Sequence, residues 1–206
     1  MTTMAVKDAS GVTQYIEGTG VGTVGDPFIP NRNAKAQEVH IGEVGGAAAV
    51  AAAAQFTRPA DVTAYASGDL VANSVTAGSV VPLTFTVARV AAGSGMVRRC
   101  RVKKSGTGVT SASFRLHLYS SAPTPANGDN GAFSTDGAAN YLGGFDVAVD
   151  RAFTDGAAGV GAPVSGSEMT FKLASGTTIR GLLEARGAYT PGNAETFDVS
   201  LEVLQN

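Results

Sequence analysis

Residues that could carry out chemistry are few in this chain of 206 residues. It has one cysteine, Cys100, and its two histidines, His40 and His117, are far apart in the sequence. We expect Cys100 to be a buried apolar side chain of a strand, and His117 to lie on the solvated face of another strand. No pattern identifies a partner for His40, and no nucleophile has an identifiable base. The sequence therefore predicts no catalytic residue and a protein that is not an enzyme.

Two segments contain residue types that bind ions in other proteins. Residues 127–131 (NGDNG) have the asparagines and aspartate of calcium loops but lack their spacing and closing glutamate. We favour turn chemistry, in which Asn and Asp side chains bond to their own backbone, and a calcium ion in this loop stays an open alternative. Residues 18–25 have four glycines but no Gly-Lys-Ser/Thr ending, so they do not form a phosphate loop. We predict no metal site and no cofactor.

Charge is unevenly distributed along the chain. Residues 1–104 carry 10 basic and 7 acidic side chains and residues 105–206 carry 5 and 10, which gives +3 and −5. Five cations fall within seven residues, namely Arg98, Arg99, Arg101, Lys103 and Lys104. We predict that Arg98, Arg99, Arg101 and Lys103 contact an acidic partner surface or the acidic half of another copy. The alternative is a solvated strand face. The net charge of −2 lacks the basic excess of nucleic-acid-binding proteins, so we expect no specific nucleic acid partner.

The composition describes a chain rich in small residues. It has 34 alanines and 27 glycines, and its charged fraction of 16% is below the roughly 25% of ordinary domains. No apolar run approaches the 18–20 residues of a membrane-spanning helix, so we expect no membrane partner. The first residues lack the pattern of a secretory signal, and a lone cysteine agrees with synthesis in a reducing cytoplasm.

Residues 1–58 lack sustained periodicity, and we interpret them as an extended, glycine-rich N-terminal arm followed by a linker. Residues 6–16 have the strand and turn chemistry of a short hairpin. Phe28, Ile29 and Pro30 follow the glycines. Burial of the phenylalanine and the isoleucine is worth about 3–6 kcal/mol, and the arm has no core of its own. We therefore predict that this segment docks on another surface, such as another chain.

From residue 59 to the end, apolar residues recur at every second position. Phe197, Val199, Leu201 and Val203 alternate with polar residues, which is typical of a half-buried strand. Further strands are predicted within residues 83–88, 99–103, 114–119, 141–149, 169–173 and 179–186. Turn residues separate these strands and no amphipathic helix lies between them. The pattern predicts an all-β fold, an antiparallel β-sandwich of the jelly-roll kind, for residues 59–206.

Three segments rich in small or turn-forming residues lack this alternation. Residues 47–54, seven alanines and a valine, are expected to be a linker that becomes a short helix or packs tightly in an assembly. Residues 121–139 and 154–166 are expected to be loops. Because loops longer than about 12–15 residues are usually functional or disordered, we expect these two to lie on neighbours in an assembly.

Two stretches of sequence resemble proteins of one kind. The opening VKDASGVTQYIEGTGVGTVGDPFIPNRN is similar to N-terminal arms in structural proteins of tailed bacteriophages. FRLHLYSSAPTPANGDNGAFS, with the later NYLGGFDV, resembles a segment of similar phage proteins. The resemblance implies a capsid decoration (cement) protein, made in the bacterial cytoplasm and placed on the exterior of the virion. Its implied partners are the major capsid protein and other copies of itself, with a trimer as one option.

Two further functions stay open at the level of sequence. One is an adhesin associated with a tail or head fibre, whose sandwich binds a host-surface glycan. The absence of Trp and the small number of Tyr residues count against it. The other is an enzyme such as a depolymerase, for which no acid–base pair at a defined spacing can be named.

Overall fold

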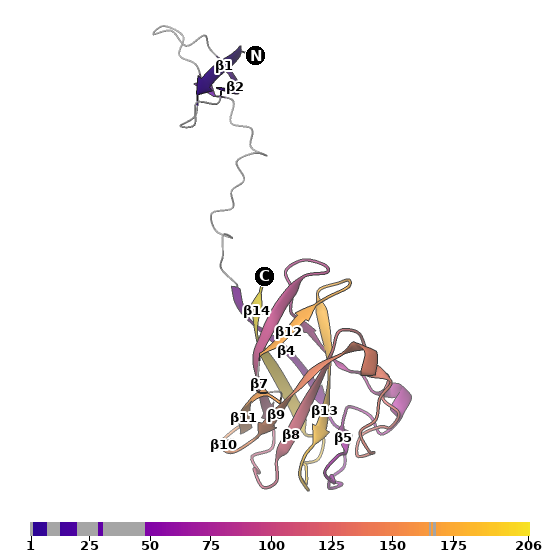
Figure 1. Cartoon of the computed structure of the whole chain (residues 1–206). Helices are drawn as coiled ribbons and strands as arrows, with labels where there is room; N and C mark the ends of the chain where they lie inside the picture. Colours follow the sequence, from indigo (N-terminus) through magenta and orange to yellow (C-terminus); the bar gives the residue numbers. More distant parts are fainter. Residues whose placement is uncertain (1, 8–12, 20–28, 31–47, 165, 167) are drawn as a thin grey trace. The chain divides into compact units, whose positions relative to one another are not determined.

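The computed structural model describes residues 2–7, 13–19, 29–30, 48–164, 166 and 168–206 (Figure 1). The chain forms two compact units, Met1–Gly46 and Ala47–Asn206. Apart from the short 3-10 turns η1 (Ala77–Ser79) and η2 (Gly137–Asn140), the regular structure of the described residues is β-strand. Neither turn is long and apolar enough to cross a membrane.

The described part of the first unit is a small antiparallel sheet in the order β1-β2-β3. β1 (Thr2–Lys7) pairs with β2 (Thr13–Thr19), and β3 (Ile29–Pro30) pairs with the end of β2. Lys7 lies opposite Thr13, so the hairpin predicted within residues 6–16 is confirmed. Its strands extend further than the sequence pattern indicated.

The second unit is a large antiparallel sheet that curls into a half-barrel (Figure 1). Its main path runs β4-β14-β7-β11-β9-β8-β13-β5, while β10, β12 and β6 pair with β11, β7 and β13. The strands are β4 (Ala48–Thr57), β5 (Leu70–Val71), β6 (Leu83–Thr86), β7 (Ser94–Lys104), β8 (Ser113–Tyr119), β9 (Tyr141–Ala148), β10 (Arg151–Phe153), β11 (Gly156–Pro163), β12 (Met169–Lys172), β13 (Thr178–Ala185) and β14 (Thr196–Gln205).

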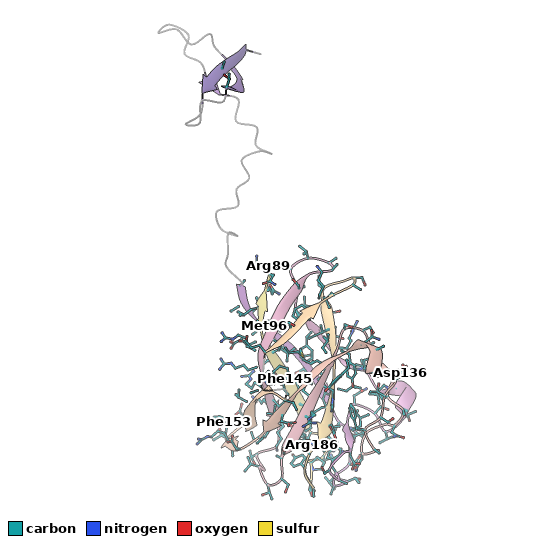
Figure 2. All side chains as sticks on the ribbon, in the orientation of Figure 1. Arg89, Met96, Asp136, Phe145, Phe153 and Arg186 are labelled. Carbon is teal, nitrogen blue, oxygen red and sulfur yellow. The ribbon has the colours of Figure 1, made fainter. Side chains whose placement is uncertain are left out.

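One apolar core fills the inside of the curled sheet. Phe114 of β8 contacts Phe197 of β14 edge to face, with ring centroids 5.3 Å apart, although these strands lie far apart along the sheet. Phe145 of β9 is fully buried in the same cluster (Figure 2). Curling thus lets the apolar face of each half of the sheet cover the other.

The period-two pattern located the strands of this core correctly. Phe197, Val199, Leu201 and Val203 are buried, and the residues between them are partly exposed. The other six strands predicted after residue 59 are also present, with shifts at their ends. Cys100 is buried on the inner face as expected, and burial raises the pKa of its thiol to about 12. The prediction of an all-β fold is confirmed.

Of residues 47–54, expected to be a linker or a short helix, residues 48–54 instead form most of strand β4. β4 pairs with β14 along its whole length, from Ala48 opposite Gln205 to Thr57 opposite Thr196. Because alanine occupies both faces of β4, the sequence shows no alternation of apolar and polar residues here. Pairing with β14 outweighs the preference of alanine for helices. The second unit begins at Ala47, whereas the expected boundary after residue 58 lies beyond its first strand.

Residues 154–166, expected to be a loop, contain strand β11, which pairs with β7 on one side and β9 on the other. A Cβ on Gly159 would lie 1.9 Å from the carbonyl oxygen of Ala148, and one on Gly161 would lie 2.2 Å from that of Asp146. Glycine is therefore required where β11 approaches the neighbouring backbone. The high glycine content, which indicated a loop, instead reflects close contact between neighbouring backbones within the sheet.

A buried ion pair joins the two edges of the curled sheet. Arg58 directly follows edge strand β4, and its Nη2 lies 2.7 Å from Oδ2 of Asp129, with both side chains almost fully buried. Asp129 also accepts a hydrogen bond from the N–H of Ala72 (2.8 Å), which follows the other edge strand β5. The hydroxyl of Tyr65 donates to the same carboxylate at 2.7 Å. The contacts of Asp129 thereby hold the loop at residues 121–139 against the rest of the second unit.

A second buried ion pair lies beside the first. Nζ of Lys104 is 3.2 Å from Oε1 of Glu195 and donates to the carbonyl oxygen of Gly106 at 2.8 Å. The hydroxyl of Tyr189 donates to the other oxygen of Glu195. The N–H of Arg58 donates to the carbonyl oxygen of Glu195 at 3.0 Å, which connects the two networks. Lys104, a member of the basic run in the sequence, is therefore an internal structural cation.

Asp129→Ala tests the closure of the sheet, because it leaves the buried Arg58 without its main charge partner. We expect the free energy of unfolding to fall by about 3–5 kcal/mol. Urea unfolding followed by circular dichroism measures this change. The control Glu168→Ala removes an exposed pair with Arg98 and should change the same quantity by less than about 1 kcal/mol. A loss no larger than that of the control would contradict a closing role for Asp129.

Candidate functional site

Strand β7 brings the four basic candidates of the second unit to the outer face of the sheet. Arg98, Arg99 and Arg101 are exposed and Lys103 is half-buried, whereas Cys100 points into the core. A β-bulge lies at Arg98, where the register with β14 shifts. The bulge lets two consecutive arginines face outward, which simple alternation does not allow.

Three of these cations have an acidic partner on the same surface. The pairs are Arg98–Glu168 (3.6 Å), Arg99–Glu202 (2.7 Å) and Lys103–Asp155 (3.0 Å). Within the described part of the chain, Arg101 forms no ion pair with an acidic side chain. The four outward cations of the basic run are thus largely neutralised, and among the described residues Arg101, in their middle, has no acidic partner. Exposed pairs of this kind add little stability.

Arg101 lies among much smaller side chains. Across the sheet it is in register with Ser200 of β14 and Val160 of β11, and Ser200 is in register with Ala53 of β4. Its long side chain borders two hollows of about 570 Å³ and 630 Å³ on this face. Arg101 is therefore accessible from both sides of β7.

The larger hollow lies over β7, β11 and β10. Its floor is formed by Ala158 and Gly159 of β11. Its walls include Arg101, Arg151, Phe153 and Val160. The Phe153 and Val160 side chains are 53% and 61% exposed, and Figure 2 shows Phe153 at the margin of the sheet. Arg151 forms no ion pair with an acidic side chain of the described residues.

Sequence reasoning missed the part of this hollow that β10 and β11 supply. Ala158, Val160 and Ala162 alternate with Gly159 and Gly161, which is the period-two signal of a strand. The glycine content concealed that signal. Without β11 as a strand, nothing in the sequence places β10 near the basic residues of β7.

The other predicted contact residues belong to the first unit. Phe28 lies outside the described residues. Ile29 and Pro30 form β3, in register with Thr19 and Gly18 of β2. The docking of this segment on another chain stays a prediction.

His117 is not the solvated histidine that the sequence predicted. Its side chain is only 12% exposed, and its Nε2 lies 2.8 Å from Oε2 of Glu184. Its Nδ1 lies 3.3 Å from the hydroxyl oxygen of Tyr141. Phe133, from the long loop at residues 121–139, stacks on the imidazole with ring centroids 4.3 Å apart. Alternation correctly put His117 on the face opposite the core, but the loop covers it there.

Charges around His117 are arranged in pairs. Burial lowers the pKa of His117 below its ordinary value, against the opposing effect of Glu184. Arg115 donates two hydrogen bonds to Asp146 (2.6 and 2.7 Å), which lowers the pKa of that carboxyl group. Arg186 forms an ion pair with Glu184 at 3.0 Å. Together with the Phe133 contact, this network connects the long loop to the outer face of β8, β9 and β13.

The loop at residues 127–131 uses its polar groups within the protein. Asp129 is engaged by Arg58 and Tyr65, and Nδ2 of Asn127 donates to the carbonyl oxygen of Ala132 at 2.7 Å. The N–H of Gly131 donates to the carbonyl oxygen of Gly128, as in a turn. In the described ranges of the chain, no group of three or more His, Cys, Asp or Glu side chains could hold a metal ion.

A scan against protein-family models and a search of curated proteins both find no match to this chain. These comparisons therefore assign no family and no function. The outer face of β7, β10 and β11 is the candidate functional site because it combines arginines that have no ion pair among the described residues, exposed apolar side chains and a hollow.

The lowered pKa of His117 predicts a pH dependence of stability. Below the ordinary histidine pKa of about 6.5, the unfolded chain gains a proton at this position before the folded chain does. Stability that is complete above this pH therefore decreases as the pH falls, by at most about 1.4 kcal/mol per pH unit for one proton. The charged and titratable groups around the ring include Glu184, Tyr141, Arg115, Arg186 and Asp146.

Urea unfolding of wild type and His117→Gln at pH 7.0 and 5.5 measures this effect. We expect the variant to lose less stability over this interval than the wild type. His40→Gln, which removes the other histidine, serves as the control and should keep the wild-type dependence. Equal losses in wild type and His117→Gln would show that His117 does not titrate in this way.

Proposed function

We propose that this chain is a non-enzymatic structural protein of a tailed-phage virion. It decorates the capsid exterior and stabilises the particle by bridging neighbouring major capsid subunits. The observation that carries the proposal is the division into two compact units, Met1–Gly46 and Ala47–Asn206, on one chain. Each unit can occupy its own contact site, and linkage turns the second binding event into an intramolecular one.

The resemblance to phage arms and to the FRLHLYSSAPTPANGDNGAFS segment supports the same function. In this proposal the second unit is a sandwich of the jelly-roll kind, and the curling of its sheet around one core supports that assignment. Its outer face over β7, β10 and β11 meets the capsid. The segment with Phe28, Ile29 and Pro30 extends the contact to a neighbouring subunit or to another copy of the protein.

Phage particles assembled without the protein test the stabilising role. Addition of the full chain should raise the temperature at which the particles release DNA by several degrees. Phe28→Ala combined with Ile29→Ala should weaken binding to the particles about a hundredfold or more, because burial of this pair is worth about 3–6 kcal/mol. Dye-detected DNA release and co-sedimentation measure the two effects.

Val62→Ala combined with Val90→Ala is the matched control, because it truncates two exposed apolar side chains of the second unit. This variant should bind and stabilise like the wild type. If the full chain binds but the temperature of DNA release stays unchanged, the protein decorates the capsid without stabilising it. If the full chain does not bind, the proposed function is wrong.

A second candidate function is glycan binding by an adhesin of a tail or head fibre. The observation that favours it is the side chain of Tyr141, which is 46% exposed beside a hollow of about 380 Å³. Gly143, Gly144 and Glu168 also line this hollow, so an aromatic face, open backbone and a carboxylate lie together. Aromatic faces and a few polar groups are what a sugar site requires.

Host-surface oligosaccharides and labelled virions distinguish this candidate from decoration. An adhesin should bind an oligosaccharide, lose that binding on Tyr141→Ala and keep it on Phe153→Ala. Antibodies against the protein should then label fibres rather than capsids in electron micrographs. Capsid labelling without glycan binding would reject the adhesin.

A further inference from the structure

The hollow over β7, β11 and β10 has an arginine on each side, and the two are displaced from each other by two residues along the strands. Arg101 is in register with Val160, and Arg151 is in register with Ala158, two residues away on the same strand β11. Their strands are two spacings apart, or about 9–10 Å, and the offset of two residues adds about 7 Å along the strand direction. Guanidinium groups at the ends of long side chains can therefore reach one ligand lying over β11.

The residues on the floor between these arginines are small, so the backbone of a binding partner can come close to it. Ala158 and Gly159 present at most a methyl group toward the hollow. Val160 and Phe153 rise on either side of this floor and are more than half exposed. Exposed apolar side chains beside small residues offer burial to an apolar group of a ligand.

The charged side chains around the hollow indicate what kind of ligand it binds. Lys103 at the rim is engaged by Asp155 (3.0 Å), whereas Arg101 and Arg151 have no ion pair among the described residues. A planar guanidinium binds a carboxylate with two parallel hydrogen bonds, which gives specificity as well as attraction. The unpaired arginines thus favour carboxylates supplied by a partner.

We propose that this hollow binds an extended, acidic segment of the protein partner, with carboxylates on Arg101 and Arg151 and an apolar side chain against Phe153 and Val160. The identification of that partner as the capsid rests on the proposed function. The acidic residues Asp150 and Asp155 on the same rim disfavour a nucleic acid, because its closely spaced phosphates would meet them. A peptide places its charges singly and avoids them.

Binding of the full chain to phage particles that lack it tests this site. Arg101→Glu and Arg151→Glu should each weaken binding at least about tenfold, and Phe153→Ala several-fold. Lys172→Glu is the matched control, because it reverses an exposed cation of β12 outside the hollow and should bind like the wild type. The wild type should lose affinity with added salt more steeply than the Arg101→Glu/Arg151→Glu double variant.

The outcomes separate this site from the proposed function. If the wild type does not bind the particles, both are overturned. If the wild type binds and the arginine variants bind equally well, or no worse than Lys172→Glu, the hollow is not the contact and decoration survives. Two other outcomes, each with particle binding unchanged, would also show that the proposal is wrong. If the arginine variants abolish self-association in sedimentation, the occupant is a second copy. If they abolish the retardation of a DNA fragment, the occupant is a nucleic acid.

Discussion

The ion pair between Arg58 and Asp129 is the interaction on which the shape of the second unit depends. A curled sheet that does not close by hydrogen bonds has two edges, and these belong to β4 on one side and to β5 and β6 on the other. Arg58 extends from the end of one edge, while Asp129 bonds to Ala72 beside the other. Burial opposes the charge of the arginine, yet Tyr65 and Asp129 hold its pKa above the ordinary value. A buried charge requires its partner in place, so the edges and the long loop are fixed together.

This closure has consequences for the outer face. With the core sealed inside, the outward side chains of β4, β14, β7 and β11 are free of packing demands. They include small residues at Ala53 and Ser200, in register with Arg101. Because this face consists of alanine, serine and glycine around a few arginines, the backbone of a partner can approach it closely. The arginines are then available for contact with charged groups of that partner. The arrangement suits a protein whose task is contact with other chains, which is the function we propose.

Much of the fold could be predicted from the sequence, because alternation reports burial directly. In β14 and β8 one face is apolar and the other polar, so the period of two identifies both the strand and its inner residues. The prediction failed in β4, where alanine occupies both faces, and in β11, where the alternation is between glycine and a small apolar residue and carries little contrast of polarity. For the candidate site, the cations of β7 could be found, since they stand in a local run. Arg151 and Phe153 could not, because only β11 connects them to that run.

The amino-acid sequence by itself determined the all-β character, most of the strands and the inward direction of Cys100, since these depend on the local order of apolar and polar residues. Only the tertiary structure decided that Lys104 is internal, that His117 is covered by Phe133 and that Asp129 neutralises Arg58. Each of these depends on a residue far away in the chain. Burial and charge pairing are properties of neighbours in space, and a one-dimensional pattern does not contain them.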